Sequence, residues 1–256
     1  MITTQYDLNG KTALVTGASG GLGESFAHAL AANGARVMVT ARRQDALERV
    51  AGDIRAEGGQ AHAAVMDVLD TGSIAAAFDA AEAVFGVPDI IVCNAGVTVT
   101  KPALDLSPAE WHQVLNTNLT GCWFTSQEAA RRLIAVSRGG SIINISSILG
   151  IRVSGAVMPY AVAKAGLNQL TRSLALEWAR YQIRVNALAP GYIETPLNQD
   201  FFASDAGTAM KRRIPMRRLG QAHELHAALM LMASDDAAYM TGSTLVVDGG
   251  HLQSML

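Results

Sequence analysis

The stretch TALVTGASGGLG, residues 12–23, decides the fold of this chain. Its first five residues are apolar or β-branched and predict a buried strand, and the glycines that follow predict a tight turn into a helix. Such a turn lets the backbone approach a phosphate, and the helix N-terminus offers it free N–H groups. The spacing of Gly17, Gly21 and Gly23 is Gly-x3-Gly-x-Gly, not the common Gly-x-Gly-x-x-Gly. We therefore predict a dinucleotide-phosphate site here, with an ordinary strand–helix turn as the alternative.

The alternation of strand and helix patterns continues to the end of the chain. Short β-branched runs predict buried strands at Thr12–Thr16, Arg36–Thr40, Gln60–Met66, Asp89–Cys93, Ser141–Ile145, Arg184–Leu188 and Thr244–Val247. Helical spacing of apolar residues predicts helices at Leu22–Ala32, Ala46–Ala56, Ser73–Phe85, Glu110–Val136, Tyr160–Ala179 and Ala222–Ala233. The sequence therefore predicts an α/β fold: a Rossmann-type, doubly wound parallel sheet of seven strands with helices on both faces, as a single domain over residues 1–256.

Composition excludes several classes of protein. Half of the 256 residues are hydrophobic and 16% are charged, which excludes a disordered chain. The net charge of -2 and the lack of long charge blocks argue against nucleic-acid binding. No apolar run is long enough for a membrane span, and the N-terminus lacks the apolar core of a signal peptide. Cys93 and Cys122 lie in apolar runs that suit buried thiols, so we expect a soluble cytoplasmic protein.

The end of the second strand bears on cofactor choice. A site for NAD(H) usually has an acid there, which binds the ribose 2′-hydroxyl. This chain has Arg42 and Arg43 instead. An arginine can pair with a 2′-phosphate, so we predict NADP(H) rather than NAD(H), with Arg42 as the main partner and Ser19 as a further hydroxyl. The alternatives are two arginines that only face solvent, and use of NAD(H).

Tyr160 and Lys164 are four residues apart on a predicted helix, so both side chains lie on one face. A phenol ionises only near pH 10 in water, and a neighbouring ammonium favours its charged form. Such a tyrosine can give or take a proton at an alcohol oxygen. Ser147 follows the preceding strand and can donate to a developing oxyanion. Asn118, inside a predicted helix, suggests a buried amide with a bound water; for Ser147 and Asn118 the alternative is a cap or a satisfied core group.

The segment 190–220 interrupts the alternation, and it contains Pro196 and Pro215. A long segment after a strand end predicts either a lid over a site or a plain surface excursion, and we favour the lid. Its basic cluster is formed by Lys211, Arg212, Arg213, Arg217 and Arg218. We interpret this cluster as a solvated face, with weak steering of an acidic carrier protein as the alternative.

Six motifs together resemble the single-domain branch of the short-chain dehydrogenase/reductase family over nearly the whole chain. They are Thr16-Gly17-x3-Gly21-x-Gly23, Asp67-Val68, Cys93-Asn94-Ala95-Gly96, the set Asn118, Ser147, Tyr160 and Lys164, the run Pro190-Gly191-Tyr192-Ile193-Glu194-Thr195, and Val246-Val247-Asp248-Gly249-Gly250. The family has asparagine where Cys93 stands, and we expect little functional loss from this change.

The resemblance implies roles for these residues. Ser147 would orient and polarise a carbonyl, and Tyr160 would transfer the proton. Lys164 would bind the nicotinamide ribose and promote ionisation of Tyr160, while Asn118 would hold a water in a proton relay. The implied cofactor-binding residues are Gly17, Ser19, Gly20, Gly21, Leu22, Gly23, Arg42, Arg43, Asp67, Val68, Asn94, Ala95, Gly96, Tyr160, Lys164, Pro190, Gly191, Ile193 and Thr195. The implied substrate residues are Ser147, Ile148, Val153, Tyr160 and Tyr192, with the 196–213 part of the lid. A homotetramer is expected by the same analogy, and no metal site is expected.

The resemblance thus implies an NADP(H)-dependent oxidoreductase that interconverts a ketone and a secondary alcohol. Because the expected pocket residues are mostly apolar, a hydrophobic ketone or a β-ketoacyl thioester is the favoured substrate. The alternatives are a 3-oxoacyl-acyl-carrier-protein reductase and a nicotinamide-sensing protein without turnover. Ser147, Tyr160 and Lys164 together argue against the last, because binding alone needs no acid/base group. Substrate identity, direction and stereochemistry stay open.

Overall fold

The computed structural model describes residues 6–195, 202 and 204–254. The strands are β1 Thr12–Thr16, β2 Arg36–Ala41, β3 Gln60–Val65, β4 Ile90–Cys93, β5 Gly140–Ile145, β6 Ile183–Pro190 and β7 Thr244–Val247. They form one parallel sheet in the order β3-β2-β1-β4-β5-β6-β7. The predicted fold class is confirmed, and each predicted strand occurs within a few residues of its expected bounds.

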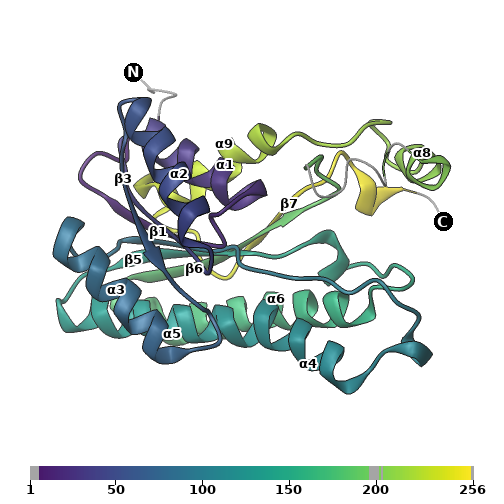
Figure 1. Ribbon diagram of the computed structural model, residues 1–256, viewed down its shortest axis with the longest axis horizontal. Coiled ribbons are helices and arrows are strands. Elements are labelled where there is room, and N and C mark those ends of the chain that lie inside the picture. Colours follow the sequence, from purple (N-terminus) through teal and green to yellow (C-terminus); the bar gives the residue numbers. More distant parts are fainter. Residues whose placement is uncertain (1–5, 196–201, 203, 255–256) are drawn as a thin grey trace.

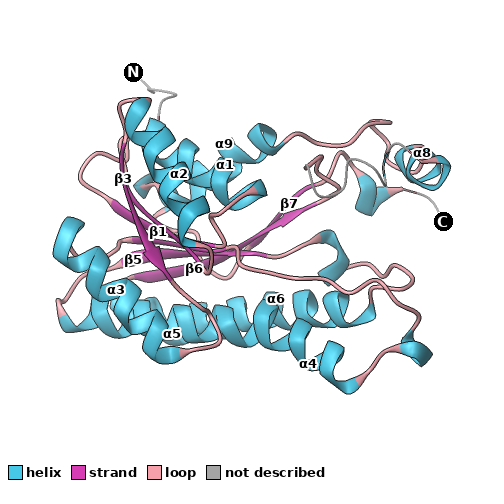
Figure 2. Ribbon diagram, viewed as in Figure 1, coloured by secondary structure: helices cyan, strands magenta, loops and turns pink. Residues whose placement is uncertain are grey.

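Helices cover both faces of the sheet (Figures 1 and 2). On one face lie α1 Gly21–Ala32, α2 Gln44–Ala56 and α9 His226–Ala233. On the other lie α3 Thr71–Phe85, α4 Pro108–Leu115, α5 Gly121–Ala135 and α6 Met158–Trp178, while α8 Asp205–Lys211 stands apart near the C-terminus. Short 3-10 turns occupy Ala103–Asp105, Ile148–Gly150, Ala179–Tyr181, Ala222–Leu225, Asp235–Ala237 and His251–Gln253. The predicted helix Ala222–Ala233 is therefore a 3-10 turn followed by α9.

The two faces of the sheet form two separate cores. Along β1, Ala13 and Val15 pack with α1, α2 and α9, whereas Leu14 packs with α3, α5 and α6. This alternation follows from the two-residue period of a strand. Because both faces are covered, the central strands are almost wholly apolar, as is typical of parallel sheets. The pattern explains why the strands could be recognised as short continuous apolar runs.

The predicted long helix Glu110–Val136 differs from the structure in one respect. It starts at Pro108, where Ser107 and Glu110 form a capping box, and it contains a π-helical turn at Asn116–Thr120. Such turns insert an extra residue into a helix and occur often at functional sites. Here the turn lies between α4 and α5 and places the side chain of Asn118 in the protein interior. The spacing of apolar residues in the sequence does not indicate this π-helical turn.

The order of the strands determines where a ligand can bind. The chain builds outward from β1 to β2 and β3, and then continues from β4 on the other side of β1. In such sheets a crevice opens at the carboxyl ends of the two strands where the direction of building reverses. Here these are β1 and β4, which end at Thr16 and Cys93. The predicted glycine loop directly follows the first of them.

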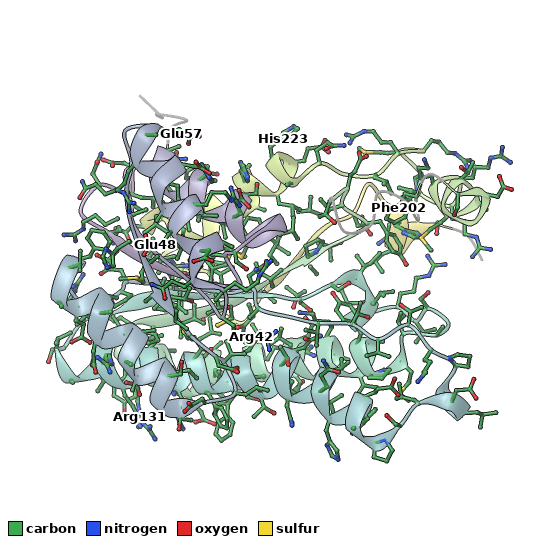
Figure 3. All side chains as sticks on the ribbon, viewed as in Figure 1. Arg42, Glu48, Glu57, Arg131, Phe202 and His223 are labelled. Carbon is green, nitrogen blue, oxygen red and sulfur yellow. The ribbon has the colours of Figure 1, made fainter. Side chains whose placement is uncertain are left out.

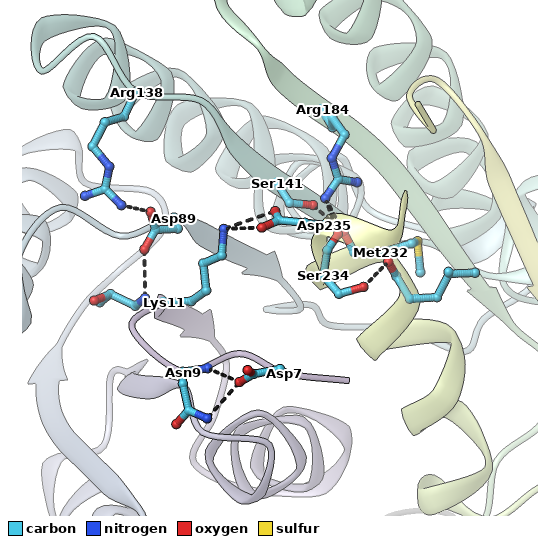
Figure 4. Close-up of polar contacts among 12 residues, drawn as sticks. Asp7, Asn9, Lys11, Asp89, Arg138, Ser141, Arg184, Met232, Ser234 and Asp235 are labelled. Carbon is cyan, nitrogen blue, oxygen red and sulfur yellow. Dashed lines mark hydrogen bonds and ion pairs between the residues drawn. The ribbon is translucent and has the colours of Figure 1, made fainter. Parts of the chain in front are cut away.

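The opposite, amino edge of the sheet is held by charged side chains that pair with one another (Figure 4). Lys11 pairs with Asp235 at 3.0 Å, and Asp89 pairs with Arg138 while also accepting a 2.9 Å hydrogen bond from the backbone at the start of β1. Arg184 donates to two carbonyls at the end of α9, each at 2.9 Å. A cavity of about 800 Å³ lies among these residues. These pairs fasten loops and helix ends to the amino edge of the sheet.

Candidate active site

A cleft of about 1210 Å³ lies at the carboxyl edge of the sheet. Most of the residues predicted for the site line it. They are Gly17, Ser19, Gly20, Gly21, Leu22, Arg42, Arg43, Asp67, Val68, Asn94, Ala95, Gly96, Ser147, Ile148, Tyr160, Lys164, Pro190, Gly191, Tyr192, Ile193 and Thr195. Three further predicted residues, Gly23, Asn118 and Val153, are not among the lining residues. Residues 196–201 and 203 of the predicted lid lie outside the described part of the chain.

The glycine loop has a backbone that side chains would obstruct. Gly17 has φ +65°, and a Cβ there would lie 2.8 Å from the Cα of Ala95. Gly21 has φ +58° at the start of α1. A Cβ at Gly23 would lie 2.4 Å from the carbonyl oxygen of Gly17, so this glycine permits close packing of α1 on the loop. The loop therefore presents bare backbone and a helix N-terminus to the cleft, which suits a pyrophosphate.

The segment after β4 braces this loop. Asn94 donates from its side-chain amide to the carbonyl oxygens of Thr16 at 3.0 Å and Gly17 at 3.2 Å. The backbone N–H groups of Asn94 and Ala95 both donate to the Thr16 hydroxyl at 2.9 Å. The carboxyl ends of β1 and β4 are thus tied together. Cys93, which replaces the family's asparagine, is buried and takes no part in this bracing, in agreement with the expectation of little loss.

Two arginines stand at the rim of the cleft beyond β2. Arg42 is exposed (Figure 3), and Arg43 donates to the Ser19 hydroxyl at 3.1 Å. A third arginine of the lining, Arg49, is already held by Glu24 at 2.8 Å and Asp53 at 3.0 Å. Those carboxylates raise the pKa of Arg49. In the described residues, the guanidinium of Arg42 has no hydrogen bond or ion pair, so it can accept an anionic partner.

Two other strand ends contribute backbone to the cleft. After β3, Asp67 accepts a 3.0 Å hydrogen bond from the N–H of Leu69, which fixes its carboxylate. After β6, Tyr192 accepts a hydrogen bond from the N–H of Gly220 at 3.0 Å through its carbonyl, and Glu194 donates back to the Gly220 carbonyl at 2.8 Å. The start of the predicted lid is therefore fastened to its end, and both close the cleft on the side away from the glycine loop.

Tyr160 and Lys164 lie in the first turns of α6, as predicted, and both line the cleft. The Lys164 ammonium is 5.5 Å from the centroid of the Tyr160 ring. Lys164 is only 3% exposed, and its Nζ donates to the carbonyl oxygen of Ile145 at 2.7 Å. A buried ammonium needs such partners, and two of its three protons stay available for a ligand in the cleft. In the described structure the hydroxyl of Tyr160 has no hydrogen-bond partner.

Ser147 is held in a defined orientation at the end of β5. Its hydroxyl oxygen accepts a 3.1 Å hydrogen bond from the N–H of Leu149. An oxygen fixed in this way retains its own proton for donation. The neighbouring Ser146 points instead into the interior, where it donates to Asn168 at 2.6 Å. The two serines of the strand end therefore differ in role: Ser146 anchors α6, and Ser147 faces the cleft.

Asn118 is buried, as expected from the sequence, and its side chain is paired with backbone groups. Its amide nitrogen donates to the carbonyl of Val97 at 2.8 Å, and its amide oxygen accepts from the N–H of Val97 at 2.7 Å. The side chain that we expected to hold a water therefore holds the segment after β4. The Asn118 carbonyl accepts a hydrogen bond from the thiol of Cys122 at 3.4 Å. The polar amide in a helix is thus explained by backbone pairing.

The substrate side of the cleft is only partly as predicted. Ile148 and Tyr192 line it, whereas Val153 is 87% exposed and does not. Burial raises the pKa of the Tyr192 phenol, and a hydrogen bond with Ser154 opposes that shift. Val153 lies in a loop, and the exposure of a loop side chain depends on the segments that pack against the loop. Its apolar character therefore did not indicate whether it is buried or exposed.

The C-terminal turn reaches this side of the cleft and was missed in the sequence. The ring of His251 lies 5.5 Å from the ring of Tyr192. Arg152 donates to the carbonyl of His251 and the hydroxyl of Ser254, each at 2.8 Å. About a hundred residues of chain separate Arg152 from its partners, and no local pattern in the sequence indicates such a pairing.

Other kinds of site were also sought in the structure. Within the described ranges, no group of three or more His, Cys, Asp and Glu side chains is placed to hold a metal ion. Over the same ranges, no helix has the length and apolar character that crossing a membrane requires. The cleft is therefore the candidate site for the predicted chemistry.

Comparisons with known proteins agree with this geometry. A family model described as enoyl-(acyl carrier protein) reductase matches residues 17–251. The chain is 42% identical to 3beta-hydroxysteroid dehydrogenase 1 of Eggerthella lenta, over 95% of this chain and 94% of that one. It is 40% identical to a 3-oxoacyl-[acyl-carrier-protein] reductase of Pseudomonas aeruginosa, over 96% and 99%.

A solved gluconate 5-dehydrogenase of Burkholderia cenocepacia, in complex with NADP and tartrate, is 36% identical and covers 98% of both chains with a TM-score of 0.93. These relatives are all oxidoreductases by name, and they act on different substrates. The glycine loop, the paired tyrosine and lysine, and these full-length matches lead to one conclusion: the chain belongs to the short-chain dehydrogenase/reductase family.

Proposed function

We propose that this protein is an NADP(H)-dependent oxidoreductase that interconverts a ketone and a secondary alcohol, with Tyr160 as the acid/base. The observation that carries the proposal is the position of Ser147, Tyr160 and Lys164 in the same cleft as the glycine loop. A group that transfers a proton, a group that polarises a carbonyl and a phosphate-binding loop are thereby available to one substrate–cofactor pair.

The residues of the cleft fit a dinucleotide. The bare backbone around Gly17 and the N-terminus of α1 would hold the pyrophosphate, and Lys164 would donate to the ribose hydroxyls. Arg42 and Arg43 would pair with a 2′-phosphate, which favours NADP(H) over NAD(H). Two similar solved structures contain NADP, one of them a putative 2-deoxy-D-gluconate 3-dehydrogenase of Agrobacterium tumefaciens. When bound, the reduced cofactor supplies a hydride to the carbonyl carbon.

The side chains of this chain supply the proton chemistry. As negative charge develops on the substrate oxygen, Tyr160 donates its phenolic proton to it, and in the reverse direction it removes that proton. The ammonium of Lys164 lies 5.5 Å from the centroid of the Tyr160 ring. Ser147 donates a hydrogen bond to the same substrate oxygen, because its own oxygen is already fixed by the N–H of Leu149.

A direct assay tests the proposal. Purified protein is given NADPH with a panel of aryl and alkyl ketones and with acetoacetyl thioesters, and the loss of NADPH absorbance is followed. We expect reduction of at least one ketone, with a lower rate when NADH replaces NADPH. If no carbonyl compound is reduced and no alcohol is oxidised, although NADPH binds, the nicotinamide-sensing alternative is correct instead.

A 3-oxoacyl-acyl-carrier-protein reductase is the second candidate. It is supported by the 40% identity to the Pseudomonas aeruginosa enzyme and by the exposed cations of the lid, among them Arg212, Arg213 and Arg217, which can attract an acidic carrier. The same assay separates the two candidates. A strong preference for the acetoacetyl thioester over every simple ketone would favour the second candidate.

We further propose that the protein is a cytoplasmic homotetramer. The support is an exposed apolar group on α5 and α6, which includes Trp123 at 40%, Val162 at 43% and Leu176 at 83% exposure. Exposed apolar side chains on neighbouring helices are typical of a protein interface. Light scattering of the purified protein tests this, and a monomeric mass would contradict it.

A further inference from the structure

Three segments far apart in the sequence meet next to Tyr192, which lines the cleft. They are the loop that follows Ser147, the end of the lid, and the C-terminal turn. We call the side chains of Arg152, Arg213 and His251 in these segments the basic triplet. Arg152 is bonded to the C-terminal turn through the carbonyl of His251.

The lid reaches the same turn by direct packing. The N–H of Met216 donates to the carbonyl of Gly249 at 3.2 Å, and a Cβ on Gly250 would lie 3.2 Å from the Cγ of Pro215. Arg213 stands two residues before Pro215. Packing of Pro215 and Met216 on Gly250 and Gly249 therefore brings the segment of Arg213 against the C-terminal turn. Burial lowers the pKa of the His251 imidazole, and the positive charges of Arg152 and Arg213 lower it further.

In the described part of the chain, the carboxylate of Asp248 also acts on His251, but it does not pair with the arginines of the triplet. Asp248 raises the pKa of His251, opposing the arginines. However, its two oxygens accept hydrogen bonds from the N–H groups of Gly250 at 2.8 Å and Leu252 at 2.7 Å. It is therefore engaged in forming the C-terminal turn, and it makes no ion pair with Arg152 or Arg213 among the described residues.

Two groups of the triplet have no structural use in the described part of the chain. Arg213 is exposed, and its guanidinium makes no hydrogen bond or ion pair there. The ring nitrogen Nδ1 of His251 is buried and lacks a hydrogen-bond partner, and the residue as a whole is only 8% exposed. Buried polar atoms are nearly always paired, so an unpaired one on a residue that contacts Tyr192 of the cleft indicates a missing partner.

The triplet is also connected to the reacting centre. Tyr192 lines the cleft and contacts the His251 ring at 5.5 Å between centroids. Burial and the hydrogen bond with Ser154 have the largest effects on the pKa of Tyr192. Tyr160 raises this pKa further, and the positive charge of Arg152 lowers it. Tyr192 therefore lines the same cleft as Tyr160 and also contacts His251 of the triplet.

We propose that the basic triplet binds an anionic oxygen group on the substrate, a carboxylate or a phosphate, while the carbonyl of the same molecule lies at Tyr160. This inference rests on the proposed function and names the substrate class for the same cleft. Guanidinium groups form charge-assisted hydrogen bonds to such anions. A triplet that only anchored the C-terminal turn would need Arg152 and would have no use for Arg213.

The first experiment compares keto acids of increasing chain length, beginning with levulinate, with their methyl esters. We expect the acid of at least one pair to be reduced with a kcat/KM about tenfold or more above its ester, mainly through a lower KM. Arg213→Ala should remove most of this preference, with a larger loss of kcat/KM for the acids than for the esters. Arg152→Gln, which keeps a donor for the C-terminal turn and removes the charge, should act in the same direction.

The matched control is Arg212→Ala, which removes an exposed arginine next to Arg213 whose charge does not act on His251. It should leave the ratio of acid to ester unchanged. A second arm compares acetoacetyl pantetheine with acetoacetyl phosphopantetheine, so that a phosphate requirement is distinguished from a carboxylate requirement. If no acid or phosphate is preferred over its neutral partner, or if Arg213→Ala leaves the preference intact, the inference is wrong.

Calorimetry separates this result from the proposed function. The saturated carboxylates that correspond to the keto acids, and their esters, are titrated into protein saturated with NADP+. Tighter binding of the carboxylate that is lost in Arg213→Ala supports the triplet even if no ketone is turned over. Reduction of ketones together with equal binding of carboxylate and ester would retain the proposed function and overturn the triplet.

Discussion

The two edges of the parallel sheet differ in whether their polar side chains have partners within the protein. At the amino edge, the charges of Lys11, Asp89 and Arg138 are each matched by a partner within the protein. At the carboxyl edge, the hydroxyl of Tyr160 has no partner in the described structure, and the guanidinium of Arg42 likewise has none. Since burying or ordering a polar group without a partner is unfavourable, the carboxyl edge retains binding capacity for another molecule.

This contrast matters because both edges contain a cavity. Volume alone would not decide between a cavity of about 800 Å³ at the amino edge and one of about 1210 Å³ at the carboxyl edge. The chemistry of their side chains does decide, because the amino edge holds ion pairs and one buried unpaired nitrogen, Nη1 of Arg184, whereas the carboxyl edge combines the glycine loop with Ser147, Tyr160 and Lys164. Substitutions at the amino edge should therefore change stability, and those at the carboxyl edge should change turnover.

The largest effect is expected for Tyr160→Phe. Loss of the only proton donor proposed for the substrate oxygen should lower kcat by about 10²–10⁴-fold, with almost normal binding of NADPH measured by fluorescence. The matched control is Tyr239→Phe, which removes the hydroxyl of an exposed tyrosine in the amino-edge cavity and should leave kcat unchanged. An active Tyr160→Phe enzyme would remove the basis of the proposed mechanism.

The next effect concerns the cofactor phosphate. Arg42→Ala should lower kcat/KM for NADPH by about 10–100-fold, since a charged hydrogen bond is worth about 1.5–3 kcal/mol, with little change for NADH. Arg43→Ala tests whether the arginine that contacts Ser19 shares this role. Arg49→Ala is the control, because that arginine is already paired with Glu24 and Asp53. Equal losses with both cofactors would contradict the assignment to a 2′-phosphate.

At the amino edge, Asp89→Asn should lower the free energy of unfolding by about 1.5–3 kcal/mol, because a buried carboxylate loses its charged bonds to the backbone of Thr12 and to Arg138. Denaturant titration measures this change. The kcat of the folded variant should stay near that of the wild type. Asp236→Asn, at an exposed position, serves as the control. A large loss of kcat in folded Asp89→Asn would show that the two edges are not independent.

The smallest expected effect is a change in how the free energy of unfolding depends on pH. Burial lowers the pKa of His251 and of His226 below the ordinary value of 6.5. Below pH 6.5 the unfolded chain therefore binds more protons than the folded one, so the free energy of unfolding falls as the pH decreases. His251→Gln should weaken this fall, as measured by denaturant titration at a series of pH values. His62→Gln, at an exposed position, should not. An unchanged pH dependence in His251→Gln would contradict the shift.

The sequence predicted the sheet and most of the cleft, but it was less informative about loops. Arg152 and Arg213 looked like ordinary surface cations, and no basic pocket was expected near the substrate. Their approach to His251 depends on how the end of the 190–220 segment packs on the C-terminal turn. The spacing of apolar residues within a segment gives no information about such packing. Val153 failed as a pocket residue for the same reason, since it is 87% exposed in a loop.

Asn118 illustrates what the sequence alone can predict and what requires the tertiary structure. Its polar amide within an apolar helix indicated burial, and the structure confirms that it is buried. The sequence did not indicate that its amide pairs with the backbone of Val97, because the chain there follows a different strand. Propensity indicates that a buried amide needs a partner, but only packing determines which partner it meets.

What the sequence alone determined about this protein is local: the strand periods, the glycine turn after β1, and the separation of Tyr160 and Lys164 by one helical turn. These features follow from backbone geometry over a few residues. Tertiary structure alone decided the partner of Asn118, the pairing at the amino edge and the meeting of Arg152, Arg213 and His251. Those contacts join residues far apart in the chain, and they arise only when helices, lid and C-terminal turn pack around the finished sheet.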